Sequence, residues 1–158
     1  MISFPNAKIN LGLNIVSKRE DGYHNIETVF YPIALSDALE IVPSNDNEAP
    51  YHFYQYGIKI DGNSDNNLVI KALNLIKLEK EIPPIDIHLI KKIPLGAGLG
   101  GGSANAAAML HLLNNNFELG YSESELIDKA STLGADCAFS IKNKPTFATG
   151  IGNVFEDI

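Results

Sequence analysis

A glycine-rich segment that runs straight into an alanine-rich one constrains this chain more than any other feature. Residues 94–107 read Pro-Leu-Gly-Ala-Gly-Leu-Gly-Gly-Gly-Ser-Ala-Asn-Ala-Ala, so five glycines fall within seven positions. Glycine lets the backbone approach a ligand closely, and the free N–H groups and dipole at the start of a helix attract anions. We therefore expect a phosphate-binding loop; a flexible loop with glycines at its turns is the alternative. The predicted phosphate-binding residues are Pro94, Leu95, Gly96, Ala97, Gly98, Leu99, Gly100, Gly101, Gly102 and Ser103.

The glycine spacing discriminates among nucleotide-binding motifs. The loop lacks the Gly-Lys-Ser/Thr ending of a Walker-type loop. Gly96, Gly98 and Gly101 do satisfy the Gly-x-Gly-x-x-Gly dinucleotide pattern, but about ninety residues of mostly antiparallel-looking strands precede it. No clear parallel strand ending in an acidic residue follows, so we rank ATP above NAD as the ligand. Ser103 has three candidate roles: to cap the helix, to contact a phosphate oxygen or to lie near a magnesium ion.

Alternation of apolar with polar or small residues predicts a series of strands joined by polar turns. Residues 2–15 read as a strand, a bend and a second strand, and a polar turn centred on Asp21-Gly22 follows. Polar loops are expected at 45–50 and 61–67. Further strands are expected at 26–35, 38–42, 51–60, 85–89 with Ile93 as an additional member, 146–150 and 154–158.

Helical spacing and capping signals predict helices in the middle and second half of the chain. Asp65 or Asn66 is expected to cap the first helix, and Ser122 and Glu125 match a capping box at the start of a later one. Strands first, then a strand, a loop and helices, indicate one α+β domain. The expected helices are 68–78, 103–113 and 122–133, followed by a turn at 134–137 and by 138–141, which begin either a strand or a short helix.

Charge and composition argue against several classes of protein. The 158 residues carry a net charge of -7, which disfavours a general nucleic-acid binder. The single cysteine, Cys137, permits no intrachain disulfide, and the four histidines show no metal-ligand spacing. The N-terminus has no basic segment followed by a long apolar run, and no apolar stretch reaches the length of a membrane span. We expect a soluble cytoplasmic protein without a metal site of its own side chains; its oligomeric state stays open.

Four motifs, in order, give the chain a family resemblance that runs from about residue 3 to residue 153. Residues 94–107 resemble the phosphate-binding motif of the GHMP kinases. The other three motifs resemble those of one branch of that family. They are an N-terminal motif at 5–13, a substrate-binding segment at 21–25 followed by Thr28 and Phe30, and a catalytic aspartate motif at 134–136.

The resemblance implies a fold and a domain organisation. The GHMP kinases are described as two-lobed, with an N-terminal lobe of the ribosomal-protein-S5-like type and a C-terminal ferredoxin-like lobe. This chain resembles the first lobe alone, so we expect residues 1–158 to form the N-terminal ATP-binding domain, with the ferredoxin-like lobe absent. The apolar, strand-like ending at 154–158 favours the same interpretation, a sequence that stops before the protein does.

The resemblance also implies an activity, which is ATP-dependent phosphorylation of a small-molecule hydroxyl with Mg²⁺. The motifs at 5–13 and 21–25 narrow the expected substrate to one that carries a cytidine diphosphate group, in the non-mevalonate route to isoprenoid precursors. Three alternatives stay open: another GHMP kinase acting on a sugar, an amino-acid alcohol or mevalonate; a nucleotide-binding module without catalysis; and a dinucleotide-dependent oxidoreductase. Neither a nucleic acid nor a membrane is an expected partner.

Lys8 and Asp136 are the catalytic residues that the resemblance implies. Asp136 is the candidate base for the substrate hydroxyl, with an ordinary turn or cap aspartate as the alternative. Lys8 lies in an otherwise apolar strand, where a buried ammonium is costly unless paired; a solvated edge-strand position is the alternative. Pairing would satisfy both charges and stabilise the transferring phosphoryl group. Asn10, on the same strand face as Lys8, would bind substrate or pair across the sheet.

The remaining candidate residues are expected to contact the cytidine part of the substrate or the adenine of ATP. By resemblance, Tyr23 and His24 would contact the cytidine part of the substrate, since aromatic side chains stack on bases and polar ones bind base edges. An exposed aromatic in a hairpin turn is the alternative. The residues that resemble positions near the adenine of ATP are Asn66, Leu68 and Lys91 or Lys92.

Overall fold

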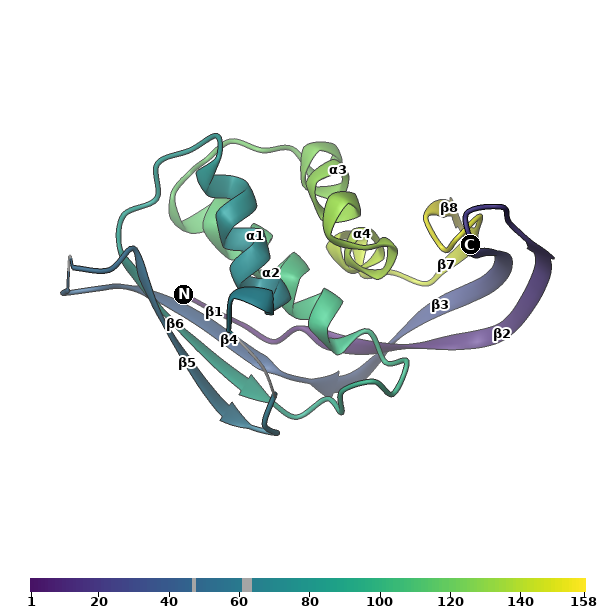
Figure 1. Ribbon diagram of the computed structural model, residues 1–158, viewed down its shortest axis with the longest axis horizontal. Helices are drawn as coiled ribbons and strands as arrows, with labels where there is room; N and C mark the ends of the chain where they lie inside the picture. The colour runs from purple at the N-terminus through teal and green to yellow at the C-terminus, as the bar shows by residue number, and fades with distance from the viewer. Residues whose placement is uncertain (47, 61–63) are drawn as a thin grey trace.

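Two four-stranded sheets and four α-helices form the computed structural model, which describes residues 1–46, 48–60 and 64–158 (Figure 1). The strands are β1 (Ile2–Ser3), β2 (Asn6–Lys18), β3 (His24–Ser36), β4 (Ala38–Pro43), β5 (Tyr51–Gly57), β6 (Ile85–Lys91), β7 (Thr146–Thr149) and β8 (Val154–Asp157). The helices are α1 (Leu68–Lys77), α2 (Gly101–Asn116), α3 (Glu123–Leu133) and α4 (Ala135–Lys142), with a 3-10 helix, η1 (Ser64–Asn66), before α1.

The first sheet has the strand order β1-β4-β6-β5 and is covered by helices on one face (Figure 1). The pair β5–β6 is parallel, whereas β1–β4 and β4–β6 are antiparallel. A parallel pair needs a crossover connection, and α1 supplies it between β5 and β6. Ile85, Ile87 and Leu89 alternate along β6 and are buried, so the covered face is the one that the period-two pattern predicted.

The main hydrophobic core lies between this sheet and the helices. Small alanine side chains let α2 approach its neighbours closely, and α1 packs beside it. The members of the core on these two helices are Val69, Ile70, Ala72, Leu73, Ile76, Ala106, Ala107, Ala108, Met109, Leu110, Leu112 and Leu113. The alanine-rich segment after the glycines is therefore a buried helix that fixes where the loop ends.

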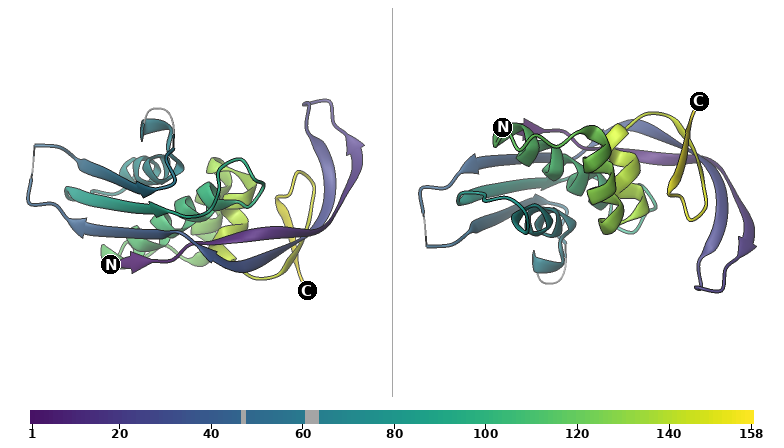
Figure 2. Two further views of the ribbon diagram at one scale, coloured as in Figure 1. Left: turned by 90° about the horizontal axis from the view of Figure 1, so that it is seen from below. Right: turned by 90° about the horizontal axis from the view of Figure 1, so that it is seen from above.

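The second sheet has the strand order β2-β3-β7-β8 and is antiparallel throughout. Its strands β2 and β3 have 13 residues each and form a long hairpin that extends away from the helices (Figure 2). Phe30 on β3 packs against Phe139 on α4, with ring centroids 5.0 Å apart. This contact joins α4 to the second sheet.

Two of the passages of the chain between the sheets lie side by side. Pro5 lies between β1 and β2, and Asp37 is the single residue between β3 and β4. The Asp37 backbone N–H donates a hydrogen bond to the Pro5 carbonyl at 3.0 Å. Both crossing segments are thus held together, which sets the position of the first residues of β2.

The α+β class predicted from the sequence is confirmed, as are the strand at each expected position and the capping box at the start of α3. Four local predictions were wrong. Helix α2 begins at Gly101 with Gly100 as its N-cap, so Ser103 lies inside the helix and does not cap it. Asn67, not Asp65 or Asn66, caps α1 by accepting a hydrogen bond from the Val69 N–H at 2.9 Å.

The expected turn at 134–137 is also wrong, because α4 begins at Ala135 and continues through the segment left open as a strand or short helix. Ile93 lies outside β6. Residues 47 and 61–63, which belong to the two expected polar loops, lie outside the described residues. In the described ranges, no helix combines the length and apolar character that a membrane crossing requires.

The capping box of α3 supports a prediction about stability. The Ser122 hydroxyl accepts a hydrogen bond from the Glu125 N–H at 3.3 Å, and the Glu125 carboxylate accepts one from the Ser122 N–H at 2.8 Å. Replacing Ser122→Ala removes the cap and should lower the free energy of unfolding by about 1 kcal/mol in a urea titration. The control Ser124→Ala changes an exposed serine in the same turn and should leave stability nearly unchanged. Equal losses in both variants would contradict the capping role.

Candidate active site

Lys8 and Asp136 meet in space although 128 residues separate them in the sequence. Lys8 comes from β2 and Asp136 from the first turn of α4, and the Lys8 Nζ lies 3.3 Å from the Asp136 Oδ2. The Lys8 side chain is 9% exposed, whereas that of Asp136 is 34% exposed. The ion pair predicted from the sequence is confirmed, and it combines a buried ammonium with a carboxylate that a ligand can reach.

The Lys8 ammonium is enclosed by further partners on the second sheet. It donates a hydrogen bond to the Asn10 Oδ1 at 2.9 Å and lies 4.5 Å from the centre of the Phe30 ring. The Asn10 Nδ2 in turn donates to the Thr28 Oγ1 at 3.1 Å. A cation over an aromatic face is favourable when water is excluded, so these contacts offset the cost of burial. Asn10 therefore pairs with Lys8 and reaches across to β3, where Thr28 and Phe30 complete the surroundings.

The glycine loop touches this ion pair directly. The Lys8 backbone N–H donates a hydrogen bond to the Leu99 carbonyl at 3.0 Å. Gly100 has a φ of +68°, and a Cβ added there would lie 3.1 Å from the Lys8 Cγ, 3.2 Å from its Cε and 3.6 Å from the Asp136 Oδ2. A side chain at position 100 would be strained and its Cβ would crowd Lys8 while making ordinary van der Waals contact with Asp136. The loop and the ion pair thus form one site.

The other loop glycines divide into two groups. A Cβ added at Gly96 or Gly98 would meet nothing within 4 Å, so this part of the backbone faces open space. Gly101 and Gly102 instead pack on protein: a Cβ would lie 2.7 Å from the Ile93 Cγ2 in the first case and 3.6 Å from the Leu68 Cδ1 in the second. The N-cap of α2 has no side-chain hydrogen bond, so the first N–H groups of the helix offer donors to an anion.

These features suit the binding of an anion, and the role of residues 94–103 as phosphate ligands stays a prediction. Ser103 lies in the first turn of α2, beside the buried thiol of Cys137. Burial raises the pKa of that thiol, and the hydrogen bond with Ser103 opposes the shift. In the described parts of the chain, His, Cys, Asp and Glu side chains form no group of three that could hold a metal ion.

Lys91, one of the adenine candidates, lies in the interior of the protein. Its side chain is fully buried in an ion pair with Asp37, and its Nζ also donates to the Asn105 Oδ1 at 3.0 Å. The ammonium is therefore engaged within the protein, and a place for Lys91 near adenine stays a prediction. Burial raises the pKa of Asp37, but hydrogen bonds from the Ile93 N–H, the Lys91 ammonium and other donors outweigh that effect and hold the pKa below its ordinary value.

The sequence reasoning missed Asp37 and Asn105. One signal was available for each: an acidic residue between two apolar strands, and an asparagine inside a run of alanines. Of the other adenine candidates, Leu68 lies beside the loop, in contact range of Gly102, whereas Asn66 is exposed in η1. Lys92 uses its backbone N–H to bind Asp37.

Tyr23 and His24 lie at the tip of the β2–β3 hairpin, which Figure 2 shows extending away from the helices. Tyr23 is 63% exposed. The turn that carries it is ordered by the Arg19–Asp21 ion pair at 2.9 Å and by a hydrogen bond from the Tyr23 N–H to the Asp21 Oδ1 at 3.1 Å. The structure therefore does not bring these two residues to the Lys8–Asp136 pair, and their contact with cytidine stays a prediction.

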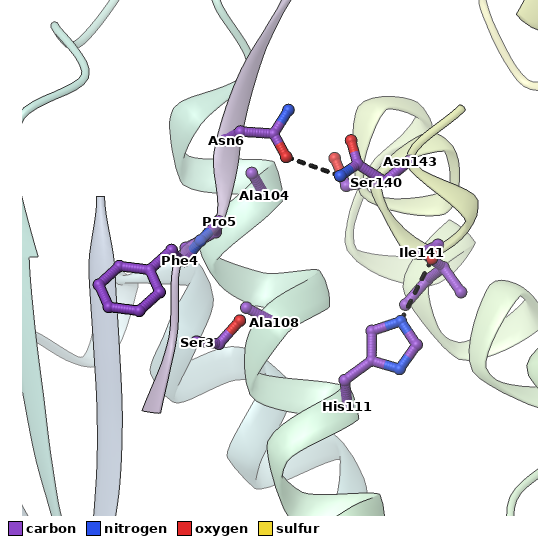
Figure 3. A pocket seen from close by; sticks show the side chains of 10 residues that line it. All are labelled: Ser3, Phe4, Pro5, Asn6, Ala104, Ala108, His111, Ser140, Ile141 and Asn143. Carbon is purple, nitrogen blue, oxygen red and sulfur yellow. Dashed lines mark hydrogen bonds between the residues drawn. The ribbon is translucent and has the colours of Figure 1, made fainter. Parts of the chain in front are cut away.

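A separate cavity of about 190 Å³ lies between the start of β2 and helices α2 and α4 (Figure 3). Across it, the Asn143 Nδ2 donates to the Asn6 Oδ1 at 2.6 Å, and the His111 Nε2 lies 3.2 Å from the Ile141 carbonyl oxygen. None of the predicted site residues lines this cavity. The open space above Gly96 and Gly98 is thus a different region.

Comparisons with known proteins agree with this geometry. A model of the GHMP kinases N terminal domain matches residues 67–145. The 4-diphosphocytidyl-2-C-methyl-D-erythritol kinases of Bacteroides fragilis and Parabacteroides distasonis are 60% and 61% identical to this chain over 158 residues. These matches cover the whole chain but only 58% and 57% of the two relatives, so the chain spans less than two thirds of their length.

Solved structures show the same fold. A crystal structure of 4-(cytidine 5'-diphospho)-2C-methyl-D-erythritol kinase has a TM-score of 0.84 and 34% identity, over 100% of this chain and 55% of that one. A mevalonate kinase structure has a TM-score of 0.71 at 13% identity, over 100% of this chain and 56% of that one. The second likeness concerns the fold alone.

Gly100 provides a test of the contact between the loop and the ion pair. Gly100→Ala and Gly96→Ala both place a methyl group at a φ of +68°, which costs about 1–2 kcal/mol for an L-residue. Only the methyl group at position 100 would meet Lys8 and Asp136, so we expect Gly100→Ala to lose about 1 kcal/mol more stability in urea unfolding. Equal losses in the two variants would show that the loop does not pack on the pair.

Proposed function

The chain belongs to the GHMP kinase family, and on that premise we propose that it is the ATP-binding part of a kinase. The proposed acceptor is a hydroxyl group of 4-diphosphocytidyl-2-C-methyl-D-erythritol, on the route to isoprenoid precursors. Residues 1–158 would serve as the N-terminal domain. The observation that carries the proposal is that the Lys8–Asp136 ion pair lies beside Gly100, because this sets a candidate base next to a candidate phosphate-binding loop.

The residues of the chain suit phosphoryl transfer, which depends on positioning and on neutralising charge. Asp136 is partly exposed and would accept the proton of the substrate hydroxyl. Lys8 holds that carboxylate in place and keeps a positive charge next to the position where negative charge develops. Asn10 restricts the Lys8 ammonium from the other side through their 2.9 Å hydrogen bond.

The backbone N–H groups of residues 94–103 would hold the phosphates of ATP, and Leu68 would lie near its base. ATP would supply the transferred phosphoryl group, and Mg²⁺ would offset the charge of the phosphate oxygens. The open space at Gly96 and Gly98 supports this assignment, since a phosphate needs close access to the backbone.

The choice of acceptor is supported by the similarity to relatives named as 4-diphosphocytidyl-2-C-methyl-D-erythritol kinases and by the hairpin. Tyr23 and His24 would hold the cytidine end of the substrate. Their position at the hairpin tip suits an elongated molecule, whose base and reacting hydroxyl lie at opposite ends of a diphosphate linkage. The exposed ring of Tyr23 is available for stacking on a base.

Phosphoryl transfer from ATP to this acceptor, followed by product mass, tests the proposal. We would use the protein encoded by the whole reading frame that carries this sequence, beside the 158-residue chain itself. The wild-type protein should form the phosphorylated product. Asp136→Asn should lower kcat by about 10²- to 10⁴-fold with little change in ATP affinity, since it removes the proton acceptor.

Asp128→Asn is the matched control, because Asp128 is an exposed aspartate on the neighbouring helix α3 and should leave kcat unchanged. Turnover of mevalonate, homoserine or galactose in place of the proposed acceptor would assign the chain to another substrate within the family. ATP binding without turnover of any acceptor would reduce the proposal to a nucleotide-binding module. No ATP binding would overturn it.

A further inference from the structure

We infer that Asp37 positions the glycine loop by holding its two ends together through a buried hydrogen-bond cluster. The inference rests on the proposed function of the loop as a phosphate-binding element. Asp37 acts through the backbone that it holds, so it is a positioning residue. The cluster consists of Asp37, Lys91 and Asn105, which are 1%, 1% and 2% exposed.

The Asp37 carboxylate binds the chain immediately before the loop. Its Oδ1 accepts hydrogen bonds from the backbone N–H groups of Lys92 at 2.7 Å and Ile93 at 2.9 Å. Pro94, the first residue of the loop, follows directly. Two donors on one oxygen fix the direction in which the chain leaves β6.

The second carboxylate oxygen binds the chain after the loop. The Asp37 Oδ2 accepts hydrogen bonds from the Asn105 Nδ2 at 2.9 Å and from the Lys91 ammonium. Asn105 lies four residues after the start of α2. Its Oδ1 accepts a hydrogen bond from the Lys91 ammonium at 3.0 Å, which is the third bond of the cluster. The triangle is closed, because each of its members is bonded to the other two.

The two ends of the loop also touch. A Cβ added at Gly101 would lie 2.7 Å from the Ile93 Cγ2 and 3.2 Å from the Lys91 Nζ, so only glycine permits this approach. Both ends of the loop, residues 94–100, are therefore held at one fixed position in the structure. The conformational entropy of the loop is lost when the chain folds, and less remains to be lost when a phosphate binds.

Stability alone is a poor explanation for this cluster. Removing two charges from water is expensive, and well-packed apolar residues of similar volume often stabilise a protein as much as a buried ion pair does. An apolar triad at these positions would fill the same volume but would leave the Lys92 and Ile93 N–H groups without acceptors. The Asp37 carboxylate differs from an apolar side chain in accepting hydrogen bonds from the backbone N–H groups at the start of the loop.

Two double variants separate the anchoring bonds from the buried charges. Both remove the ion pair: Asp37→Asn/Lys91→Met keeps an acceptor for the Lys92 and Ile93 N–H groups, and Asp37→Ala/Lys91→Met does not. In the first variant the new amide nitrogen replaces the Oδ2 that accepts from the Asn105 Nδ2, so the Asn105 amide must turn over, after which its Oδ1, released by Lys91, accepts from the new amide. A single Asp37→Asn change is avoided, because it leaves a buried ammonium without its counter-charge.

The measurements are the dissociation constant for ATP with Mg²⁺ by calorimetry and the hydrogen-exchange rates of backbone amides 95–100 without nucleotide. Both use the whole protein, well below its unfolding temperature, with circular dichroism to confirm folding. We expect Asp37→Ala/Lys91→Met to weaken ATP binding about tenfold and to speed exchange in the loop by a similar factor. Asp37→Asn/Lys91→Met should stay within about threefold of the wild type in both.

Equal exchange rates in the two folded variants and the wild type would overturn the inference. Lack of ATP binding by the wild type would instead overturn the proposed function, and the exchange rates would still decide whether Asp37 anchors the loop. If Asp37→Ala/Lys91→Met does not fold, Asn105→Ala serves in its place, since it cuts only the link to α2. It should speed exchange in the loop at least about threefold, and an unchanged rate would overturn the inference.

Discussion

The hydrogen bond between the Asp37 N–H and the Pro5 carbonyl joins the two segments that pass from one sheet to the other. Two parts of the site are positioned from this crossing. Lys8 follows Pro5 by three residues and enters the second sheet beside Phe30. The side chain of the same Asp37 binds the residues that lead into the glycine loop. The contact between Pro5 and Asp37 therefore links two parts of the site. On one side it leads to Lys8, the partner of the candidate base, and on the other to the candidate phosphate-binding loop.

Signals that involve neighbours in the sequence predicted the structure well. The capping box at Ser122, the period-two strands and the helix after the glycines needed only local information. The family resemblance singled out Lys8 and Asp136, and their pairing was anticipated because a lysine in an apolar strand needs a counter-charge. Lys91 presented the same problem, but no motif pointed to its partner: Asp37, 54 positions away, immediately precedes β4, the strand next to β6.

The helix boundaries that were wrong have a common cause. Gly101 and Gly102 disfavour a helix by intrinsic propensity, but Gly101 packs on Ile93, and that contact decides where α2 begins. In the same way α4 starts at once after Gly134, because the Phe139 side chain is buried against Phe30. A fold that also occurs in mevalonate kinase is no guide to the acceptor, so specificity must be sought in parts such as the hairpin tip.

The buried cluster around Asp37 has a consequence for the order of folding. Its bonds join residues that are 54 and 68 positions apart, and they need β4, β6 and α2 to be in place together. Contacts of such long sequence separation form late, after the entropy of closing large loops has been overcome. We therefore expect the helices and the hairpin to form before the glycine loop is anchored. A nucleotide that binds only the finished loop would stabilise the fold by mass action.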